Sequence, residues 1–128
     1  MIVTWSTLRE KRMPVTNTDE NGSVLQRLMS VIEDRKRNPP ERSYTTSLFA
    51  GGVAKIGAKI TEEAAEVVEA AGEPGPEGRQ HLVHEAADLI YHLFVMLGHR
   101  DIPLTEVETE LARRFGISGL DEKAAREE

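Results

Sequence analysis

Apolar residues recur every three to four positions through residues 23–115, the period of an amphipathic helix. The first such segment covers residues 24–37 and stops before two prolines. Its apolar stripe is Leu25, Leu28, Met29 and Ile32. Three further segments cover about 48–71, 77–98 and 104–115, and strand patterns are nearly absent. The chain is therefore expected to be all-α, a four- to five-helix bundle.

The second and third segments are separated only by the short loop GEPGPEG, so they are expected to form a central antiparallel helix hairpin. Thr45, Thr46 or Ser47 is the expected N-cap of the second segment. The glycines at 51, 52 and 57 weaken its first half, each by up to about 1 kcal/mol relative to alanine. Its expected core face is Ile56, Ile60, Ala64, Val67, Val68 and Ala71.

The third segment is apolar around most of its circumference, which predicts a buried central helix. Its apolar positions are Leu82, Val83, Ala86, Leu89, Ile90, Leu93, Phe94, Val95 and Leu97. One polar strip remains, and it carries Glu85 and Asp88 together with three histidines. An unpaired carboxylate on a buried helix is costly, so this strip needs partners.

Composition narrows the class of protein. The chain has 128 residues, enough for one domain, with residues 1–22 read as a flexible arm and 116–128 as a tail. Met13 offers an alternative start, and the first residues lack the apolar core of a signal peptide, so a cytoplasmic location is expected.

A net charge of -6 argues against nucleic acid as a partner, and no apolar run is long enough to span a membrane. With no cysteine, a thiol nucleophile and a thiolate zinc site are excluded.

Acidic residues gather where the two hairpin helices face each other. The stretch ITEEAAEVVEAA, residues 60–71, places Glu63 and Glu66 about two turns before the loop, and Glu85 and Asp88 lie about two turns after it. A hairpin brings the two pairs to similar heights, and converging carboxylates suit a hard divalent cation such as Mg²⁺. Lys55 and Lys59, on the same face, suit an anionic substrate such as a phosphate ester.

Other interpretations fit the same residues. The carboxylates could form an ion-pair network with Lys55, Lys59 and Arg79, and Glu62 and Glu69 could simply face solvent. On that reading the chain is a non-catalytic helical interaction module. A ferritin-like di-iron bundle fits poorly, because it uses paired E-x-x-H motifs and none occurs here.

The motifs EE-x-x-E at 62–66 and E-x-x-D at 85–88 resemble the metal-binding signature of the all-α, MazG-like nucleoside triphosphate pyrophosphohydrolases. Three further motifs narrow the resemblance: EDRK, P-x-x-SYT-x-x-L and E-x-x-D-x-x-YH. With these, residues 25–114 resemble the phosphoribosyl-ATP pyrophosphohydrolases, which act second in histidine biosynthesis. The nearest alternative is a house-cleaning nucleoside triphosphate pyrophosphohydrolase with the same acidic motifs and a different base pocket.

The resemblance implies Mg²⁺-dependent hydrolysis of phosphoribosyl-ATP to phosphoribosyl-AMP and pyrophosphate, by a homodimer or a dimer-based oligomer. It implies that Glu63, Glu66, Glu85 and Asp88 bind the metal, and that Glu62 supports them or orients the attacking water. It also implies that Lys55, Lys59 and Arg35 contact phosphates. His92 is expected beside the ligands or as a donor to the substrate. Asp34, Ser43, Tyr44 and Thr45 match motif positions without an assigned role.

Overall fold

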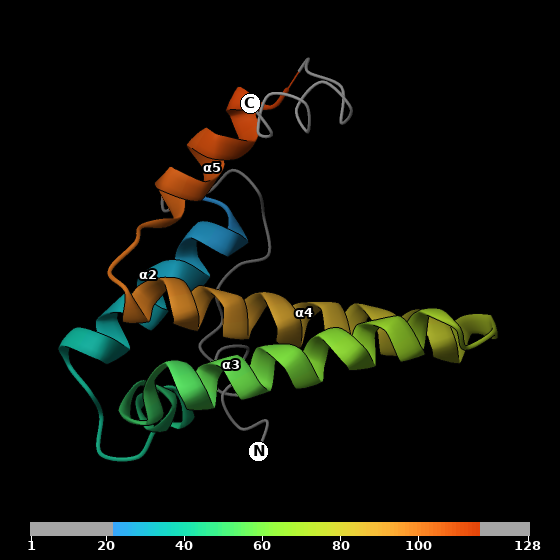
Figure 1. Ribbon diagram of the computed structural model, residues 1–128, viewed down its shortest axis with the longest axis horizontal. Coiled ribbons are helices and arrows are strands. Elements are labelled where there is room, and N and C mark those ends of the chain that lie inside the picture. The colour runs from blue at the N-terminus through green and yellow to red at the C-terminus, as the bar shows by residue number, and fades with distance from the viewer. Residues whose placement is uncertain (1–21, 116–128) are drawn as a thin grey trace.

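The computed structural model describes residues 22–115, and that part of the chain forms four α-helices and no strand (Figure 1). They are α2 (Val24–Arg37), α3 (Tyr44–Ala71), α4 (Gly75–His99) and α5 (Leu104–Arg113). The all-α prediction is confirmed, and the first helix has the predicted bounds. The arm and the tail lie outside the described residues, except for Gly22.

The centre of the fold is an antiparallel hairpin of α3 and α4, as predicted (Figure 1). Gly72 ends α3, and α4 begins at Gly75, whose φ of 75° suits a residue without a side chain. At Gly78 the loop backbone passes so close that an added Cβ would lie 2.2 Å from the Glu73 carbonyl oxygen. Glycine at 78 therefore allows the tight return of the chain.

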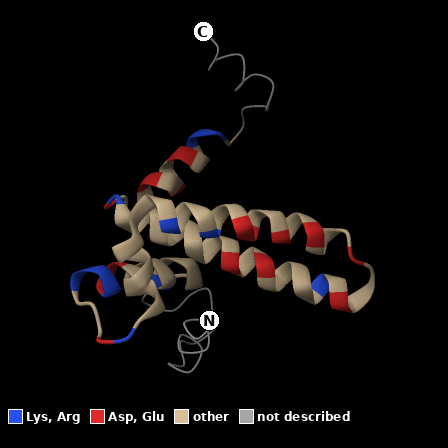
Figure 2. Ribbon diagram, turned by 60° about the horizontal axis from the view of Figure 1, so that its bottom comes forward, with Lys and Arg blue, Asp and Glu red and all other residues tan. Residues whose placement is uncertain are grey.

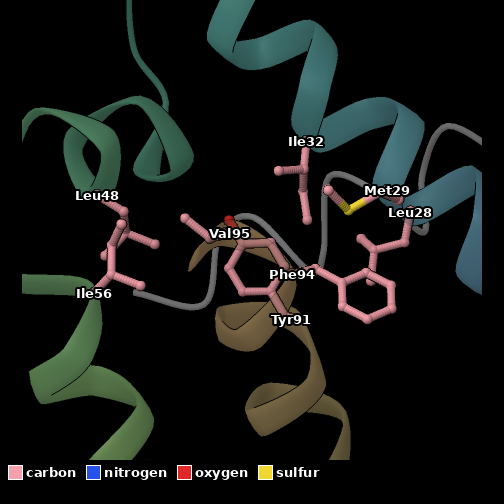
Figure 3. Packing of buried hydrophobic residues seen from close by; sticks show 8 residues of the cluster. All are labelled: Leu28, Met29, Ile32, Leu48, Ile56, Tyr91, Phe94 and Val95. Carbon is pink, nitrogen blue, oxygen red and sulfur yellow. The ribbon is translucent and has the colours of Figure 1, made fainter. Parts of the chain in front are cut away.

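The core lies where α2 crosses the end of the hairpin opposite the loop (Figure 3). Its buried residues come from three helices: Leu28, Met29 and Ile32 of α2, Leu48 and Ile56 of α3, and Tyr91, Phe94 and Val95 of α4. Lys36 ties α2 to this end, because its Nζ donates to the carbonyl oxygens of Gly98 and His99, 3.0 and 3.1 Å away. A cation at the last carbonyls of a helix also complements the helix dipole.

The second helix begins four residues earlier than the sequence pattern predicts. Its N-cap is Ser43, whose hydroxyl accepts a hydrogen bond from the Thr46 backbone N–H at 3.2 Å. The predicted caps, Thr45, Thr46 and Ser47, lie inside the helix instead. Gly52 then breaks the helix, with φ 70° and ψ -161°, so residues before and after it run in different directions. This kink lets the first turns carry Tyr44 and Thr45 back against α4.

Alanine at position 52 is expected to lower the free energy of unfolding by about 1–3 kcal/mol, because this φ/ψ region is open essentially only to glycine. Space is not the obstacle, since the nearest atom to an added Cβ is His99 Cε1 at 4.0 Å. Gly57→Ala is the matched control: position 57 is helical, with Met96 Cε 3.9 Å from the added Cβ. That variant is expected to gain about 0.5–1 kcal/mol. Urea denaturation compares the two, and equal stabilities would contradict the expected strain.

The hairpin exposes more apolar surface than the sequence pattern predicts. Leu25 on α2, and Val68 and Ala71 on the predicted core face of α3, are exposed, Val68 by 73%. Helix α4 is not buried all round, because Val83 and Leu93 are also exposed. The reason is that α2 covers only one end of the hairpin, and no residue of α5 is buried. No helix among residues 22–115 is both long and apolar enough to cross a membrane.

Candidate metal and phosphate site

Three carboxylates of α3 lie close together beside the contact with α4. Glu62, Glu63 and Glu66 each offer an oxygen within 4.8 Å of the other two. Their i, i+1 and i+4 spacing produces this grouping, since residues four apart lie one turn above each other. Glu63 is the buried member, with 6% of its surface exposed, whereas Glu62 faces solvent.

Helix α4 presents a second group opposite the first. His84, Glu85 and Asp88 also offer ligand atoms within 4.8 Å of one another, and Glu85 is buried. The acidic segments of α3 and α4 lie next to each other along the middle of the hairpin (Figure 2). Both predicted carboxylate pairs therefore reach the contact between the helices.

The electrostatics of Glu63 show that the two groups share one site. The pKa of Glu63 is raised to about 8, first by its burial and then by the neighbouring carboxylates of Glu85, Asp88 and Glu66. Two of these neighbours belong to α4 and one to α3. The four carboxylates named by the sequence motifs therefore act on one another across the hairpin.

Two buried oxygens of this cluster lack a partner. Glu63 Oε1 and Glu85 Oε1 are buried and accept no hydrogen bond in the described part of the chain. Buried acceptors are almost always paired, because a missing partner costs about 1–3 kcal/mol. Carboxylate oxygens are the ligands that Mg²⁺ prefers in proteins. The cluster therefore fits a hard cation both by its donor atoms and by its unpaired ones.

Lys59 is the basic residue closest to the cluster. Its Nζ lies 3.2 Å from Glu62 Oε1 and 3.6 Å from Glu63 Oε2, and it bonds the former. This contact is one of those expected if the carboxylates form an ion-pair network with basic side chains. Lys55 is exposed, its stem lying over Gly51, and within residues 22–115 neither it nor Arg79 forms an ion pair. Lys59 alone leaves the two buried oxygens without a partner.

Each acidic residue of the α4 group pairs with a histidine one turn earlier. His84 Nε2 lies 3.3 Å from Asp88 Oδ2, and His81 Nε2 lies 3.1 Å from Glu85 Oε2. His81 Nδ1 is also 2.9 Å from Glu73 Oε1, in the hairpin loop. The pKa of His81 is raised, chiefly by Glu73. A protonated His81 donates to both carboxylates and fixes the orientation of Glu85.

His92 is buried, with only 4% of its surface exposed. Its Nδ1 is 2.8 Å from the Asp88 carbonyl oxygen, and its Nε2 is 2.9 Å from the Tyr44 hydroxyl. Burial lowers the pKa of His92, which favours the neutral imidazole. Both ring nitrogens are occupied within the fold.

Arg35 lies on α2, in the part of that helix that contacts the end of α4. It precedes Lys36, which holds the carbonyl of Gly98 near the end of α4. At 1.5 Å per residue, Gly98 lies about 15 Å along the axis from Asp88. In the described residues no hydrogen bond or ion pair joins Arg35 to the acidic cluster.

Sequence reasoning left two features of the site unassigned. Tyr44 reaches His92 only through the Gly52 kink, which no helical periodicity reveals. The pairing of His81 with Glu85 and of His84 with Asp88 follows an i, i+4 spacing that the sequence does display. Of these two histidines, His84 is exposed, while His81 is half-buried and bonded.

Residues 25–115 match the family model described as phosphoribosyl-ATP pyrophosphohydrolase. Curated relatives named phosphoribosyl-ATP pyrophosphatase are similar over most of their length. That of Rhodopirellula baltica is 56% identical over 102 residues, 80% of this chain and 85% of the relative. That of Geobacter sulfurreducens is 50% identical over 110 residues, 86% of this chain and 99% of the relative. That of Rhodobacter capsulatus is 50% identical over 104 residues, 81% of this chain and 98% of the relative.

Proposed function

The chain belongs to the phosphoribosyl-ATP pyrophosphohydrolase family, and from that membership we propose how its carboxylate cluster works. As a member, it is an enzyme that hydrolyses phosphoribosyl-ATP to phosphoribosyl-AMP and pyrophosphate, a step of histidine biosynthesis. Water attacks a phosphoanhydride bond, one P–O bond forms, another breaks, and pyrophosphate leaves. The roles of individual residues, the metal and the assembly are the proposed part.

Glu63, Glu66, Glu85 and Asp88 bind Mg²⁺ in this proposal. The observation that carries it is the pair of buried, unpaired oxygens on Glu63 and Glu85, which lie on opposite helices of one cluster. An ion-pair network with Lys59 gives them no partner. In the metal-free protein a proton on Glu63 joins it to Glu85, and a cation can take the place of that proton. Mg²⁺ bound there lowers the pKa of a water molecule and neutralises charge on phosphate oxygens.

The surrounding residues complete the site. When an anionic phosphate group of the substrate binds, Lys59 leaves Glu62 and turns to the phosphate. There its positive charge stabilises the negative charge that builds up on the phosphate oxygens. Glu62, exposed at the edge of the cluster, accepts a proton from the attacking water or orients it. Lys55 adds positive charge one turn away, and Arg35 reaches only the outer parts of the substrate. His81 and His84 hold the carboxylates of α4 in place.

A second copy of the chain covers the exposed apolar side of the hairpin in this proposal. Val53, Val68, Val83 and Leu93 are between 45% and 73% exposed, although they lie on the two central helices. Among residues 22–115, no other helix buries them. A homodimer, or a larger assembly of dimers, removes this surface from water. A cytoplasmic location is the corresponding proposal for a biosynthetic enzyme.

The direct test measures pyrophosphate released from phosphoribosyl-ATP, with Mg²⁺ and with excess chelator. Turnover is expected with the metal and is expected to be lost without it. A panel of common nucleoside triphosphates, assayed in parallel, is expected to react much more slowly. Equal turnover of the panel would favour a house-cleaning pyrophosphohydrolase. No pyrophosphate from any substrate would leave only a helical interaction module.

A further inference from the structure

Tyr44 is fixed by a chain of hydrogen bonds that starts on α4. The Asp88 carbonyl oxygen can only accept, so His92 Nδ1 carries the proton and donates to it at 2.8 Å. His92 is 4% exposed, and its ring nitrogens bond only the Asp88 carbonyl and the Tyr44 hydroxyl, so the buried ring is neutral and Nε2 is an acceptor. The Tyr44 hydroxyl therefore donates its proton to His92 Nε2, 2.9 Å away.

The ring of Tyr44 is held as firmly as its hydroxyl. It stacks on Tyr91, with ring centroids 6.3 Å apart and planes at 19°, and it meets His92 edge-on at 5.8 Å. Tyr91 is itself anchored by a hydrogen bond between its hydroxyl and Thr45. Tyr44 nevertheless stays half-buried, so part of its side chain is exposed to solvent.

The hydroxyl of Tyr44 lies within the field of the carboxylate cluster. Burial raises its pKa, and the charges of Lys59, Glu63, Glu62 and Asp88 all act on it. Because its proton is donated to His92, the phenol oxygen presents only lone pairs to this site. Tyr44 is therefore a fixed, neutral acceptor beside the residues that hold the phosphates and the metal.

We propose that Tyr44 accepts a hydrogen bond from a hydroxyl group of the ribose adjoining the substrate's phosphates. Phosphates and ionised carboxylates have no proton to give, and Lys59 serves the phosphate oxygens in the proposed function. Sugar hydroxyls are the substrate donors closest to the phosphate chain. This inference rests on the proposed function and adds a residue that distinguishes ribose from deoxyribose.

The test compares kcat/KM for phosphoribosyl-ATP with that for its analogues lacking the 2′- or the 3′-hydroxyl of the adenosine ribose. The natural protein is expected to prefer the ribose form over one analogue by about tenfold, the worth of one neutral hydrogen bond. Tyr44→Phe is expected to bring that ratio close to one, by slowing the ribose substrate and leaving the deoxy analogue unchanged. A ratio unaltered in Tyr44→Phe would overturn the inference.

Two further outcomes are decisive. Equal slowing of all three substrates by Tyr44→Phe would leave the ribose preference unchanged and so overturn the ribose contact. If the natural protein does not hydrolyse phosphoribosyl-ATP at all, the proposed function fails, and this inference fails with it. The turnover of the natural protein therefore separates the two failures.

Control variants separate recognition from folding. Tyr91→Phe removes a neighbouring hydroxyl that is buried against Thr45, so it is expected to lower stability without changing the ratio. His92→Leu removes the acceptor that holds Tyr44, so it is expected to lower the ratio. The double variant Tyr44→Phe/His92→Leu is expected to have the same ratio as Tyr44→Phe alone. If the double variant instead has a lower ratio than Tyr44→Phe alone, His92 does not act through Tyr44, and the chain of contacts is overturned.

Discussion

Glu63→Gln is expected to lower kcat by roughly 10³-fold or more while the fold remains intact. A metal contributes several kcal/mol to the transition state, and each 1.36 kcal/mol is a factor of ten in rate. Glutamine keeps the shape of the side chain but removes the negative charge that the cation needs. Steady-state pyrophosphate release measures kcat, and helical circular dichroism reports the fold. Asp88→Asn is expected to act in the same direction.

The stability of the same variant gives a second readout. Glu63 is buried, and its raised pKa means that its charged form is unfavourable in the metal-free protein. Glutamine removes this charge, so the metal-free variant is expected to unfold at the same temperature as the natural protein or at a higher one. Glu69→Gln, on an exposed part of the same helix, is the control and is expected to keep full activity. Normal turnover by Glu63→Gln would refute the site.

The affinity for Mg²⁺ is expected to rise steeply between pH 6 and pH 8. Metal ligands must be deprotonated, and below a pKa of about 8 each pH unit leaves roughly tenfold less of the Glu63 carboxylate. The folded pKa lies above the ordinary value of 4.5, so the metal-free protein loses stability as pH rises from that value through about 8. Mg²⁺ binds the ionised site and restores stability over the same range.

Titration calorimetry at pH 6, 7 and 8 measures this effect, and two buffers of different ionisation enthalpy count the protons released. His81 contacts Glu85, and its pKa is raised above the ordinary value chiefly by Glu73, so its proton also enters the count. Comparison with Glu63→Gln isolates the contribution of Glu63, since His81 is common to both proteins. A Kd for Mg²⁺ that stays constant from pH 6 to pH 8 in the natural protein would contradict the burial of an ionisable ligand.

Periodicity was sufficient to predict the helices and the hairpin. The apolar repeat predicts α2 with its observed ends, because the two prolines after Arg37 permit no other stop. The short Gly/Pro loop requires antiparallel helices, and the distance of each carboxylate pair from that loop then fixes their register. The facing of Glu63 with Glu85 and Asp88 follows from these local features alone.

What periodicity could not predict depends on tertiary structure. A helical wheel assigns Val68 to the core, but it does not tell whether a single chain has enough helices to cover that side. The apolar repeat also predicts a straight α3. In the structure Gly52 has non-helical φ/ψ values, and the helix bends there. The place of Tyr44 depends on that bend, so its contact with His92 could not be read from spacing.

The contact from Glu73 through His81 to Glu85 has a consequence for engineering. Exposed loops such as the one between α3 and α4 usually tolerate insertions, epitope tags or exchange with a relative's sequence. Its Glu73 side chain nevertheless decides how Glu85 is oriented, and Gly78 must keep its close approach to the same segment. Grafts at this tip are therefore expected to leave the Glu85 carboxylate in its present orientation only when they carry both residues with them.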